Sequence, residues 1–346
     1  MNDSSGKLRI LLLSDDLPGH RSQSRGLVKW LENRYSVVCY ESSVRLKCKL
    51  LARLILPHLV RSPFLAFVVV QFYRGVPSGS QDFDLIISAG GSTSFLNVAL
   101  AQQWHIPNVF MGSKRRLHSE DFAAHLTLEE TGEPHNIVMM LAPTQIDPTE
   151  LQQKGKELRL EQGLAADERF NMLAVGGDGA GYQYDRTSVQ NIAELMKQEY
   201  RKTDKRWLLT TSRRTGPVLE QQLKETVPAE LLADAVWWSE APRKVMVAYM
   251  GAADCLFITA DSMSMIAEAI FSTRPVVVLR PGKANPETRY ADALDRYEKE
   301  GLCRLATLGQ PICPPPEGSC AVVRAREALL DELSDQLGLN AFRHRC

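Results

Sequence analysis

Short, continuously apolar runs alternate with longer amphipathic stretches along the chain. Such runs are typical of parallel strands covered on both faces, and the stretches between them are typical of helices. In the first half the pattern predicts strands at 8–13, 37–40, 84–88, 107–111 and 136–141, with helices at 24–33 and 94–104. In the second half it predicts strands at 170–175, 207–211, 235–238, 255–259 and 275–279, with helices at 188–200, 245–252, 263–271, 287–300 and 322–337.

Strands and helices alternate in two successive blocks, which predicts an α/β fold with two doubly wound, Rossmann-like domains. Right-handed crossovers bring the loops that follow the strands to one edge of each sheet, where ligands bind. We expect the two domains to face a cleft. The blocks place an N-terminal domain at 1–150 and a C-terminal domain at 151–320, which begins with a connecting helix near 149–168. We expect the last segment, 321–346, to be a helix that packs back on the N-terminal domain.

Composition and charge exclude several classes of protein. Of the 346 residues, 44% are apolar and 24% are charged, as in a globular rather than a disordered chain. Lys plus Arg and Asp plus Glu both number 41, so the chain lacks the basic excess of a duplex-binding protein, and we expect no nucleic-acid partner. The 7 cysteines form no CxxC or CxxH pair. Scattered thiols indicate neither a disulfide framework nor a zinc site, and they favour a cytoplasmic location.

One apolar and basic segment, residues 46–74, raises the question of membrane contact. Its longest charge-free run, 62–73, is shorter than the ~20 residues needed to span a bilayer. A mixture of basic and apolar residues could instead lie on an anionic surface at the inner face of a membrane. The alternative is a buried pair of helices broken at Pro57 and Pro63. The basic residues of the segment are Lys47, Lys49, Arg53, Arg61 and Arg74.

The loop after the predicted strand at 255–259 carries the most specific pattern. Asp261 or Ser262 is expected to cap the helix that follows, and the free amides of its first turn can bind a phosphate with help from the helix dipole. Ser264 adds a hydroxyl group on that turn. Glu268, roughly two turns from Asp261, could accept hydrogen bonds from a ribose. The alternative is an ordinary capped helix with a solvated Glu268.

Two further loops of the C-terminal domain could contact the same ligand. One follows the strand at 207–211 and contains two arginines, whose guanidinium groups make bidentate, charge-assisted contacts with a diphosphate. The other follows the strand at 170–175 and is rich in glycine, which would let the backbone approach a ligand closely. The alternatives are solvated surface turns. The candidate donor-binding residues are Ser212, Arg213 and Arg214 in the first loop and Gly177 and Asp178 in the second.

The N-terminal domain offers candidates for the acceptor side. The loop after its first strand contains Asp16 and His20, either of which could take a proton from an acceptor hydroxyl group as the catalytic base. The loop after its third predicted strand contains Gly90, Gly91 and Ser92, which could hold an acceptor sugar or phosphate. The alternatives are a polar helix cap in the first loop and a tight strand-to-helix turn in the second.

Common metal-binding and phosphate-binding signatures are absent from the sequence. The histidines form no HExxH pattern, and the chain contains no P-loop and no GxSxG elbow. We therefore expect no metal site and no resident cofactor.

Three strings resemble the mitochondrial-fission "elongated mitochondria" family, bacterial and plant proteins classed with the glycosyltransferases of GT-B-like fold. They are AVGGDGAGYQYD at 174–185, TTSRRTGP at 210–217 and TADSMSMIAEAIFSTRPVVVL at 259–279. The third is the most specific, because the family pattern resembles TADSxSMxxEA followed by a short strand. The resemblance implies a GT-B-like fold with a nucleotide-sugar donor in the C-terminal domain and an acceptor in the N-terminal domain. It places Gly177, Ser212, Arg213, Arg214, Ser262 and Ser264 around the diphosphate and Glu268 on the ribose.

The acceptor side departs from the family pattern. Gly91 stands where a basic residue is expected. Two further signatures, Pro-Arg and His-Asp, are replaced by the stretches 114–118 and 128–130. These differences point to a different acceptor.

Together the observations predict a metal-independent glycosyltransferase that moves a sugar from a nucleotide-sugar donor to a cell-surface glycan or a glycolipid acceptor. Amides at the helix tip and Arg213 or Arg214 would stabilise the negative charge that forms on the leaving diphosphate. Two alternatives stay open. One is a sugar-nucleotide epimerase, which needs no acceptor, and the other is a non-enzymatic, membrane-associated recruitment scaffold.

Overall fold

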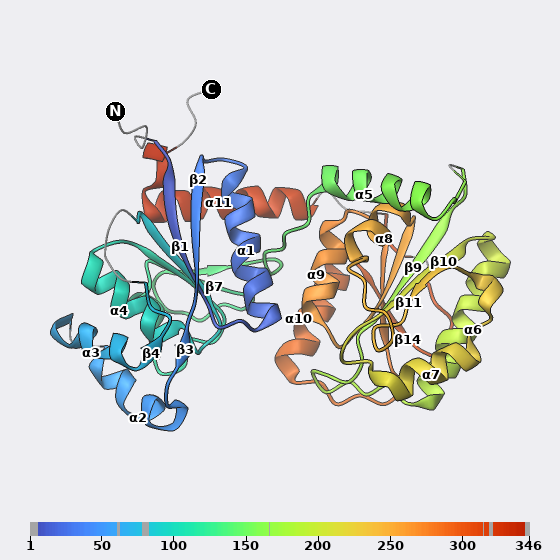
Figure 1. Cartoon of the computed structure of the whole chain (residues 1–346), viewed down its shortest axis with the longest axis horizontal. Helices are drawn as coiled ribbons and strands as arrows, with labels where there is room; N and C mark the ends of the chain where they lie inside the picture. The colour runs from blue at the N-terminus through green and yellow to red at the C-terminus, as the bar shows by residue number, and fades with distance from the viewer. Residues whose placement is uncertain are drawn as a thin grey trace. The chain divides into compact units, whose positions relative to one another are not determined.

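Two six-stranded parallel sheets with flanking helices organise the chain (Figure 1). The computed structural model describes residues 6–60, 63–77, 83–165, 167–313, 315–317 and 321–342. One unit is formed by Met1–Gln145 together with Val323–Cys346, and the other by Ile146–Val322. The prediction of two doubly wound α/β domains is confirmed, while the cleft between them stays a prediction.

The sheet of the first unit has the strand order β2-β1-β5-β6-β7-β8, and all neighbouring strands are parallel. The central strands are buried on both faces, which explains their continuously apolar sequences. The strands are β1 (Leu8–Ser14), β2 (Val37–Ser43), β5 (Leu85–Ala89), β6 (Asn108–Met111), β7 (Ala124–Thr127) and β8 (Asn136–Val138). The helical segments that connect them are α1 (Pro18–Glu32), α4 (Ser94–Trp104) and the 3-10 turn η2 (Ser119–Asp121).

A helical excursion interrupts the first unit between β2 and β5. It is closed at its base by a short antiparallel pair, in which Arg45 lies opposite Arg74. Pro57 lies inside the first of its helices, so the predicted break at Pro57 is wrong; the amide of Val60 still donates to the carbonyl of Leu56 at 3.0 Å and completes the last turn. Its elements are β3 (Arg45–Leu46), α2 (Lys49–Leu59), η1 (Pro63–Leu65), α3 (Ala66–Gln71) and β4 (Tyr73–Arg74), and residues 61–62 lie outside the described residues.

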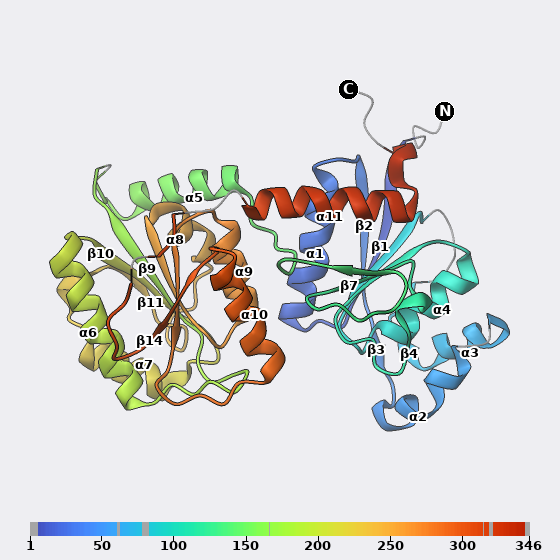
Figure 2. The same cartoon turned by 180° about the vertical axis from the view of Figure 1, so that it is seen from behind.

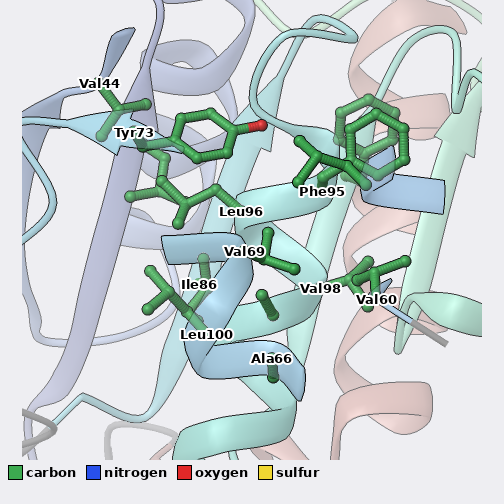
Figure 3. Packing of buried hydrophobic residues seen from close by; sticks show 14 of the residues in the cluster. Val44, Val60, Ala66, Val69, Tyr73, Ile86, Phe95, Leu96, Val98 and Leu100 are labelled. Carbon is green, nitrogen blue, oxygen red and sulfur yellow. The ribbon is translucent and has the colours of Figure 1, made fainter. Parts of the chain in front are cut away.

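The inner face of the excursion belongs to the core of the first unit. Figure 3 shows Ala66 and Val69 of α3 packed beside Leu96 and Leu100 of α4. Leu56 of α2 is buried in the same cluster. None of the described helices is both long and apolar enough to cross a bilayer.

The C-terminal helix α11 (Ala321–Leu337) makes its polar contacts with the first unit (Figure 2). Arg34, which follows α1, donates to Glu327 at 2.6 Å and to Asp331 at 2.6 Å. The Tyr35 hydroxyl group lies 2.6 Å from the hydroxyl group of Ser334, and both side chains are buried. A short 3-10 turn, η4 (Leu339–Phe342), follows, and residues 343–346 lie outside the described residues.

The sheet of the second unit has the parallel strand order β11-β10-β9-β12-β13-β14. If the six strands are numbered 1 to 6 in the order in which they occur along the chain, their order in the sheet is 3-2-1-4-5-6, which is the arrangement of a dinucleotide-binding fold. The strands are β9 (Phe170–Val175), β10 (Arg206–Thr211), β11 (Leu232–Val236), β12 (Cys255–Thr259), β13 (Val276–Arg280) and β14 (Arg304–Thr307). The helical segments are α5 (Pro148–Glu161), α6 (Arg186–Thr203), α7 (Gly216–Thr226), η3 (Ala229–Leu231), α8 (Met246–Ala252), α9 (Met263–Phe271) and α10 (Thr288–Lys299).

Two glycines allow α5 to cross α8 at backbone contact. A Cβ atom on Gly155 would lie 2.5 Å from the carbonyl carbon of Gly251, and one on Gly251 would lie 1.9 Å from the carbonyl oxygen of Leu151. Arg159 of α5 also donates to the carbonyl of Ala252 at 3.1 Å. The predicted connecting helix is therefore an integral part of the second unit.

We expect Gly251→Ala to destabilise the second unit although alanine favours helices by about 1 kcal/mol over glycine. There is no room for the added methyl group. Even after the neighbouring backbone has relaxed, overpacking of this kind lowers the free energy of unfolding by about 1–3 kcal/mol. The midpoint of thermal unfolding, followed by circular dichroism, should fall by about 2–10 °C. Gly282→Ala is the matched control, because a Cβ atom there meets nothing within 4 Å. Equal unfolding midpoints for the two variants would contradict the packing argument.

Candidate functional site

The second unit has a topological switch point at β9, where the strand order reverses between β10 on one side and β12 on the other. The carboxyl ends of the strands border a ligand-binding crevice at such a point in doubly wound sheets. The loops after β9, β10 and β12 carry the predicted donor-binding residues 177–178, 212–214 and 262. Ser264 and Glu268 follow on α9.

A buried carboxylate joins two of these loops. The Asp261 side chain is 0% exposed. Its Oδ1 atom accepts a hydrogen bond from Thr259 Oγ1 at 2.6 Å, and its Oδ2 atom accepts one from Arg214 Nη2 at 2.5 Å. Burial raises the pKa of the Asp261 carboxyl group, against the hydrogen bond from Thr259 and the charge of Arg214, because the ionised form has lost its water.

The glycine-rich loop packs directly on this ion pair. A Cβ atom on Gly176 would lie 2.1 Å from Asp261 Oδ2, and one on Gly177, whose φ is +125°, would lie 2.4 Å from the carbonyl oxygen of Arg214. The amide of Gly176 donates to Thr259 Oγ1 at 2.7 Å. These two glycines are therefore required for close packing between loops, whereas sequence reasoning assigned them to close approach of a ligand.

Hydroxyl groups of the loop after β10 complete the contacts. Ser212 Oγ donates to the carbonyl of Gly176, and Thr215 Oγ1 lies 2.9 Å from the same carbonyl. We call this set of contacts the Asp261 network. Its members are Gly176, Ser212, Arg214, Thr215, Thr259 and Asp261, and it fixes the loops after β9, β10 and β12 relative to one another.

The first turn of α9 is left without a side-chain cap. Ser262 occupies the N-cap position but makes no capping hydrogen bond, and the Asp261 carboxylate faces the Asp261 network instead. Ser262 is thus the N-cap residue, one of the two predicted, but its side chain makes no capping hydrogen bond. The amides of residues 263–265 donate to no other group in the part of the chain that the structure describes. Ser264 Oγ lies 3.3 Å from Ser262 Oγ, so both hydroxyl groups stand at this uncapped turn.

The other predicted donor-binding residues differ in exposure and in their contacts. Arg213 is exposed and makes no ion pair or hydrogen bond with another described residue. Asp178 is exposed, and its Oδ1 atom accepts from the amide of Tyr184 at 3.0 Å. Glu268 is half-buried on α9 and already interacts with another group of the protein. Arg213 is thus the exposed cation of the loop that remains unused by the fold.

A pocket that sequence reasoning missed adjoins the Asp261 network. It has a volume of about 520 Å³ and lies between the loops after β9 and β13, with Asp178, Gly179, Lys283 and Asn285 in its lining. A Cβ atom on Gly179 would lie 2.7 Å from the Arg214 guanidinium group, so the pocket and the network share this glycine. A Gly-Lys-Ala-Asn turn directly after an apolar strand was the signal in the sequence.

The buried Tyr184 and the half-buried Tyr290 hold the loop after β12 in place. The Tyr184 hydroxyl group donates to the carbonyl of Leu279 at 2.7 Å and accepts from the amide of Ala260 at 2.8 Å. The Tyr290 hydroxyl group donates to the carbonyl of Ala260 at 2.8 Å. Burial raises the pKa of both phenol groups, so both stay protonated and keep these hydrogen bonds. The residue before Asp261 is therefore fixed from both sides.

The first unit has its own switch point at β1, flanked by β2 and β5. The buried Asp15 carboxylate there accepts from His20 Nδ1 at 3.0 Å and from Ser92 Oγ. Burial acts to raise the pKa of Asp15, but the hydrogen bonds from His20 and Ser92 outweigh it and hold that pKa below its ordinary value. Nδ1 of His20 is thus engaged, and its Nε2 atom has no partner in the part of the chain that the structure describes.

The structure does not bring Asp16 to His20. Asp16 has a φ of +60°, and its carboxylate accepts from Ser43 and, at 3.3 Å, from Arg45 Nη2. The two consecutive carboxylates therefore point to different partners. Sequence reasoning found the loop but did not single out Asp15, the carboxylate that orients the imidazole ring.

The predicted acceptor-binding turn packs against the side chains of His20 and Arg115. A Cβ atom on Gly90, whose φ is +85°, would lie 2.1 Å from His20 Nδ1, and one on Gly91 would lie 2.2 Å from Arg115 Nε. Ser92 is fixed through its carbonyl, which accepts from the Tyr73 hydroxyl group at 2.9 Å. Gly90, Gly91 and Ser92 therefore sit together beside His20, with Arg115 reaching over the turn.

The loop after β6 supplies the positive charge at this edge. Lys114 pairs with Glu133, and this contact lowers the pKa of Glu133 to about 2. Arg115 and Arg116 are exposed, and neither makes an ion pair with another described residue. These residues belong to the stretch that departs from the family pattern, so this edge of the first unit's sheet carries a local excess of positive charge.

Comparison with known proteins gives a family and a fold. The family model described as Mitochondrial fission ELM1 matches residues 18–328, which confirms the resemblance seen in the sequence. Comparison with curated proteins returned no significant match.

Solved structures resemble the whole chain at low sequence identity. UDP-GlcNAc 2-epimerase from Methanocaldococcus jannaschii aligns with a TM-score of 0.54 at 13% identity, over 95% of this chain and 99% of that one. The S. aureus MnaA–UDP co-structure aligns with a TM-score of 0.50 at 12% identity, over 97% and 92%. ADP-heptose LPS heptosyltransferase II from E. coli aligns with a TM-score of 0.48 at 12% identity, over 96% and 99%. The fold is GT-B-like.

The raised pKa of Asp261 predicts a pH-dependent stability difference. Its ionisation is harder in the folded chain than in the unfolded chain, so the wild type loses stability relative to Asp261→Asn as the pH rises above the ordinary value of 3.8. The unfolding midpoint of the variant minus that of the wild type should therefore increase between about pH 4 and pH 7.

Asp185→Asn is the control of opposite sign. Hydrogen bonds from Ser188 lower the pKa of Asp185, so the wild type gains stability relative to this variant as the pH rises. If the midpoint difference for Asp261→Asn is constant or follows the trend of Asp185→Asn, the account of the buried carboxylate is wrong.

Proposed function

The chain belongs to the Mitochondrial fission ELM1 family, and we propose that it is a metal-independent glycosyltransferase that moves a sugar from a nucleotide-sugar donor to a glycan or lipid-linked acceptor. The observation that carries the proposal is the uncapped first turn of α9 at the switch point of the second unit, where the Asp261 network also holds the loop that carries the exposed Arg213. Unpaired amides at a helix N-terminus, together with a guanidinium group from an adjoining loop, would form an anion site suited to a diphosphate. The GT-B-like fold and the co-structure of MnaA with UDP support this assignment.

In this proposal the second unit stabilises the leaving group. Cleavage of the bond between the anomeric carbon and the diphosphate builds negative charge on the diphosphate oxygen. Amides of residues 263–265, the hydroxyl group of Ser264 and the Arg213 side chain would neutralise that charge without a metal ion. Arg214 has a different role, because its ion pair with Asp261 holds the loop rather than the ligand. Glu268 would accept from the ribose, and the pocket lined by Asp178 and Lys283 would supply polar groups to the rest of the donor.

The first unit would supply the base. As the acceptor oxygen attacks the anomeric carbon, its proton passes to Nε2 of His20, while Asp15 holds the Nδ1 proton and stabilises the imidazolium ion that forms. A direct displacement of this kind inverts the anomeric centre. Gly90, Gly91 and Ser92 would bind the acceptor, and Arg115 would favour one that carries a negative charge.

A sugar-nucleotide epimerase is the second candidate, because the solved structure from Methanocaldococcus jannaschii with this fold is named as one. Incubation with a nucleotide sugar alone separates the two functions. A new sugar-nucleotide isomer would establish the epimerase, whereas release of nucleoside diphosphate that depends on an added acceptor would establish the transferase.

Nucleoside diphosphates should raise the unfolding temperature of the wild type. A ligand at 100 times its dissociation constant adds about 2.7 kcal/mol, which corresponds to roughly 5–10 °C for a domain of this size. In a thermal-shift panel of UDP, GDP and ADP, Arg213→Ala should weaken binding of the best ligand about tenfold or more. Arg201→Ala, which removes an exposed arginine of α6, is the control. If no diphosphate stabilises the wild type, the donor site is refuted and the recruitment scaffold is favoured.

Loss of the base should separate catalysis from donor binding. We expect His20→Ala and Asp15→Asn to lower kcat of acceptor-dependent transfer by about 10²–10⁴ and to leave the diphosphate-induced thermal shift unchanged. Asp16→Asn distinguishes the two neighbouring carboxylates. If it abolishes transfer while Asp15→Asn does not, Asp16 rather than Asp15 works with His20.

A further inference from the structure

Exposed apolar side chains gather on the helical excursion of the first unit. Phe64 is 89% exposed and Phe67 is 56% exposed, and Leu54 and Leu65 are also exposed large apolar residues. Phe64 and Phe67 are three residues apart across η1 and α3, a spacing that places two side chains on one face of a helical turn. A cluster of exposed apolar side chains, in contrast to single scattered ones, marks an interaction site.

The exposed phenylalanines belong to a well-anchored element. Val60, Ala66 and Val69 are buried in the core of the first unit, where they pack with α4 (Figure 3). Figure 1 shows α2 and α3 at the periphery of this unit, beyond β3 and β4. The inner face of the excursion therefore packs within the fold, whereas Phe64 and Phe67 stay exposed among the residues that the structure describes.

The Lys, Arg, Asp and Glu residues of the excursion are all basic. No Asp or Glu occurs between Glu41 and Asp82, whereas the same stretch contains 6 Lys or Arg residues in a chain whose net charge is zero. Arg45 and Arg74 lie directly opposite each other in the β3–β4 pair, an arrangement that is unfavourable for like charges. Asp16 offsets Arg45 at 3.3 Å, but Arg74 is exposed and makes no ion pair with another described residue.

We propose that this face, which comprises Leu54, Phe64, Leu65, Phe67 and Arg74 and is called here the excursion face, binds the surface of an anionic phospholipid bilayer. The phenylalanines would enter the interface between headgroups and acyl chains, and the basic side chains would contact lipid phosphates. The proposal is independent of the donor site, because it concerns only the excursion of the first unit.

Charge complementarity favours an anionic bilayer, rather than a second copy of the chain, as the partner of the excursion face. A second copy of the chain that packed through the same face would bring two identical basic surfaces together, which is repulsive in a two-fold symmetric interface. A bilayer containing anionic lipid presents a continuous negative surface that can offset the exposed charge of Arg74. The small number of exposed apolar residues suits shallow insertion rather than a large protein interface.

Co-sedimentation with vesicles, without any nucleotide, tests the proposal. The wild type should bind vesicles of phosphatidylcholine and phosphatidylglycerol at low ionic strength, bind pure phosphatidylcholine weakly, and dissociate at high salt. Phe64→Ser with Phe67→Ser should lower the partition coefficient about tenfold or more. Arg74→Gln should lower it roughly fivefold, which corresponds to ~1 kcal/mol per basic residue near the surface.

Leu160→Ser is the matched control. Leu160 of α5 is 83% exposed, so its substitution removes an exposed apolar side chain from the other unit, and vesicle binding should be unchanged. Circular dichroism should give the same unfolding midpoint for the wild type and for the Phe64 and Phe67 double variant, because those side chains are exposed.

Two results would overturn the proposal. The first is that the folded wild type fails to bind the anionic vesicles, or that Leu160→Ser weakens binding as much as the double variant. The second is that the wild type is a dimer in light scattering that the double variant splits, with no vesicle binding by either. In that case a second copy covers the excursion face. Neither result bears on the donor site, which the thermal-shift panel tests separately.

Discussion

The buried Asp261 carboxylate determines the geometry of the candidate donor site. An ionised carboxylate without exposed surface is stable only when its oxygens are hydrogen-bonded and its charge is offset, and Thr259 and Arg214 do both. The same contacts turn the side chain away from α9. The N-cap position itself belongs to Ser262, whose side chain makes no capping hydrogen bond, so the first-turn amides lack a side-chain cap. The ordered loop and the open helix terminus therefore lie side by side at positions 261 and 262.

The first unit uses a carboxylate in a similar place with a different partner. Asp15 follows the central strand β1 as Asp261 follows β12, and each carboxylate ties two loops together at a switch point. The difference lies in the cation. Arg214 is permanently charged and can only hold structure or an anion, whereas the imidazole ring of His20 has a nitrogen that can serve as a general base. The division of the proposed reaction between leaving-group stabilisation and proton transfer follows from this contrast.

Sequence patterns predict the central strands because continuous apolar runs leave little choice of structure. The same pattern misses β7 and β14, which have four residues each; β7 contains the buried His125, whose imidazole bonds to Ser119 and to the carbonyl of Gly112. The candidate loops were found because polar residues after a buried strand mark a sheet edge. Their internal contacts were not predictable: the pairing of His20 with Asp15 rather than Asp16 depends on backbone angles, and Gly176 meets Thr259 across 83 residues.

A net charge of zero conceals how the cations of this chain are used. Some of the arginines form ion pairs that stabilise the fold. Arg21 and Arg25 both pair with Glu41, and Arg214 pairs with the fully buried Asp261. Others lie at the candidate edges and make no ion pair with another described residue; these are Arg213 in the second unit and Arg115 in the first. A paired arginine at a loop indicates architecture, because releasing it would leave a carboxylate without its counter-charge. An unpaired arginine beside an open helix terminus or a histidine costs little to keep hydrated and is free to gain a ligand. The proposed roles of Arg213 and Arg214 differ for this reason, although the two residues are adjacent in the sequence.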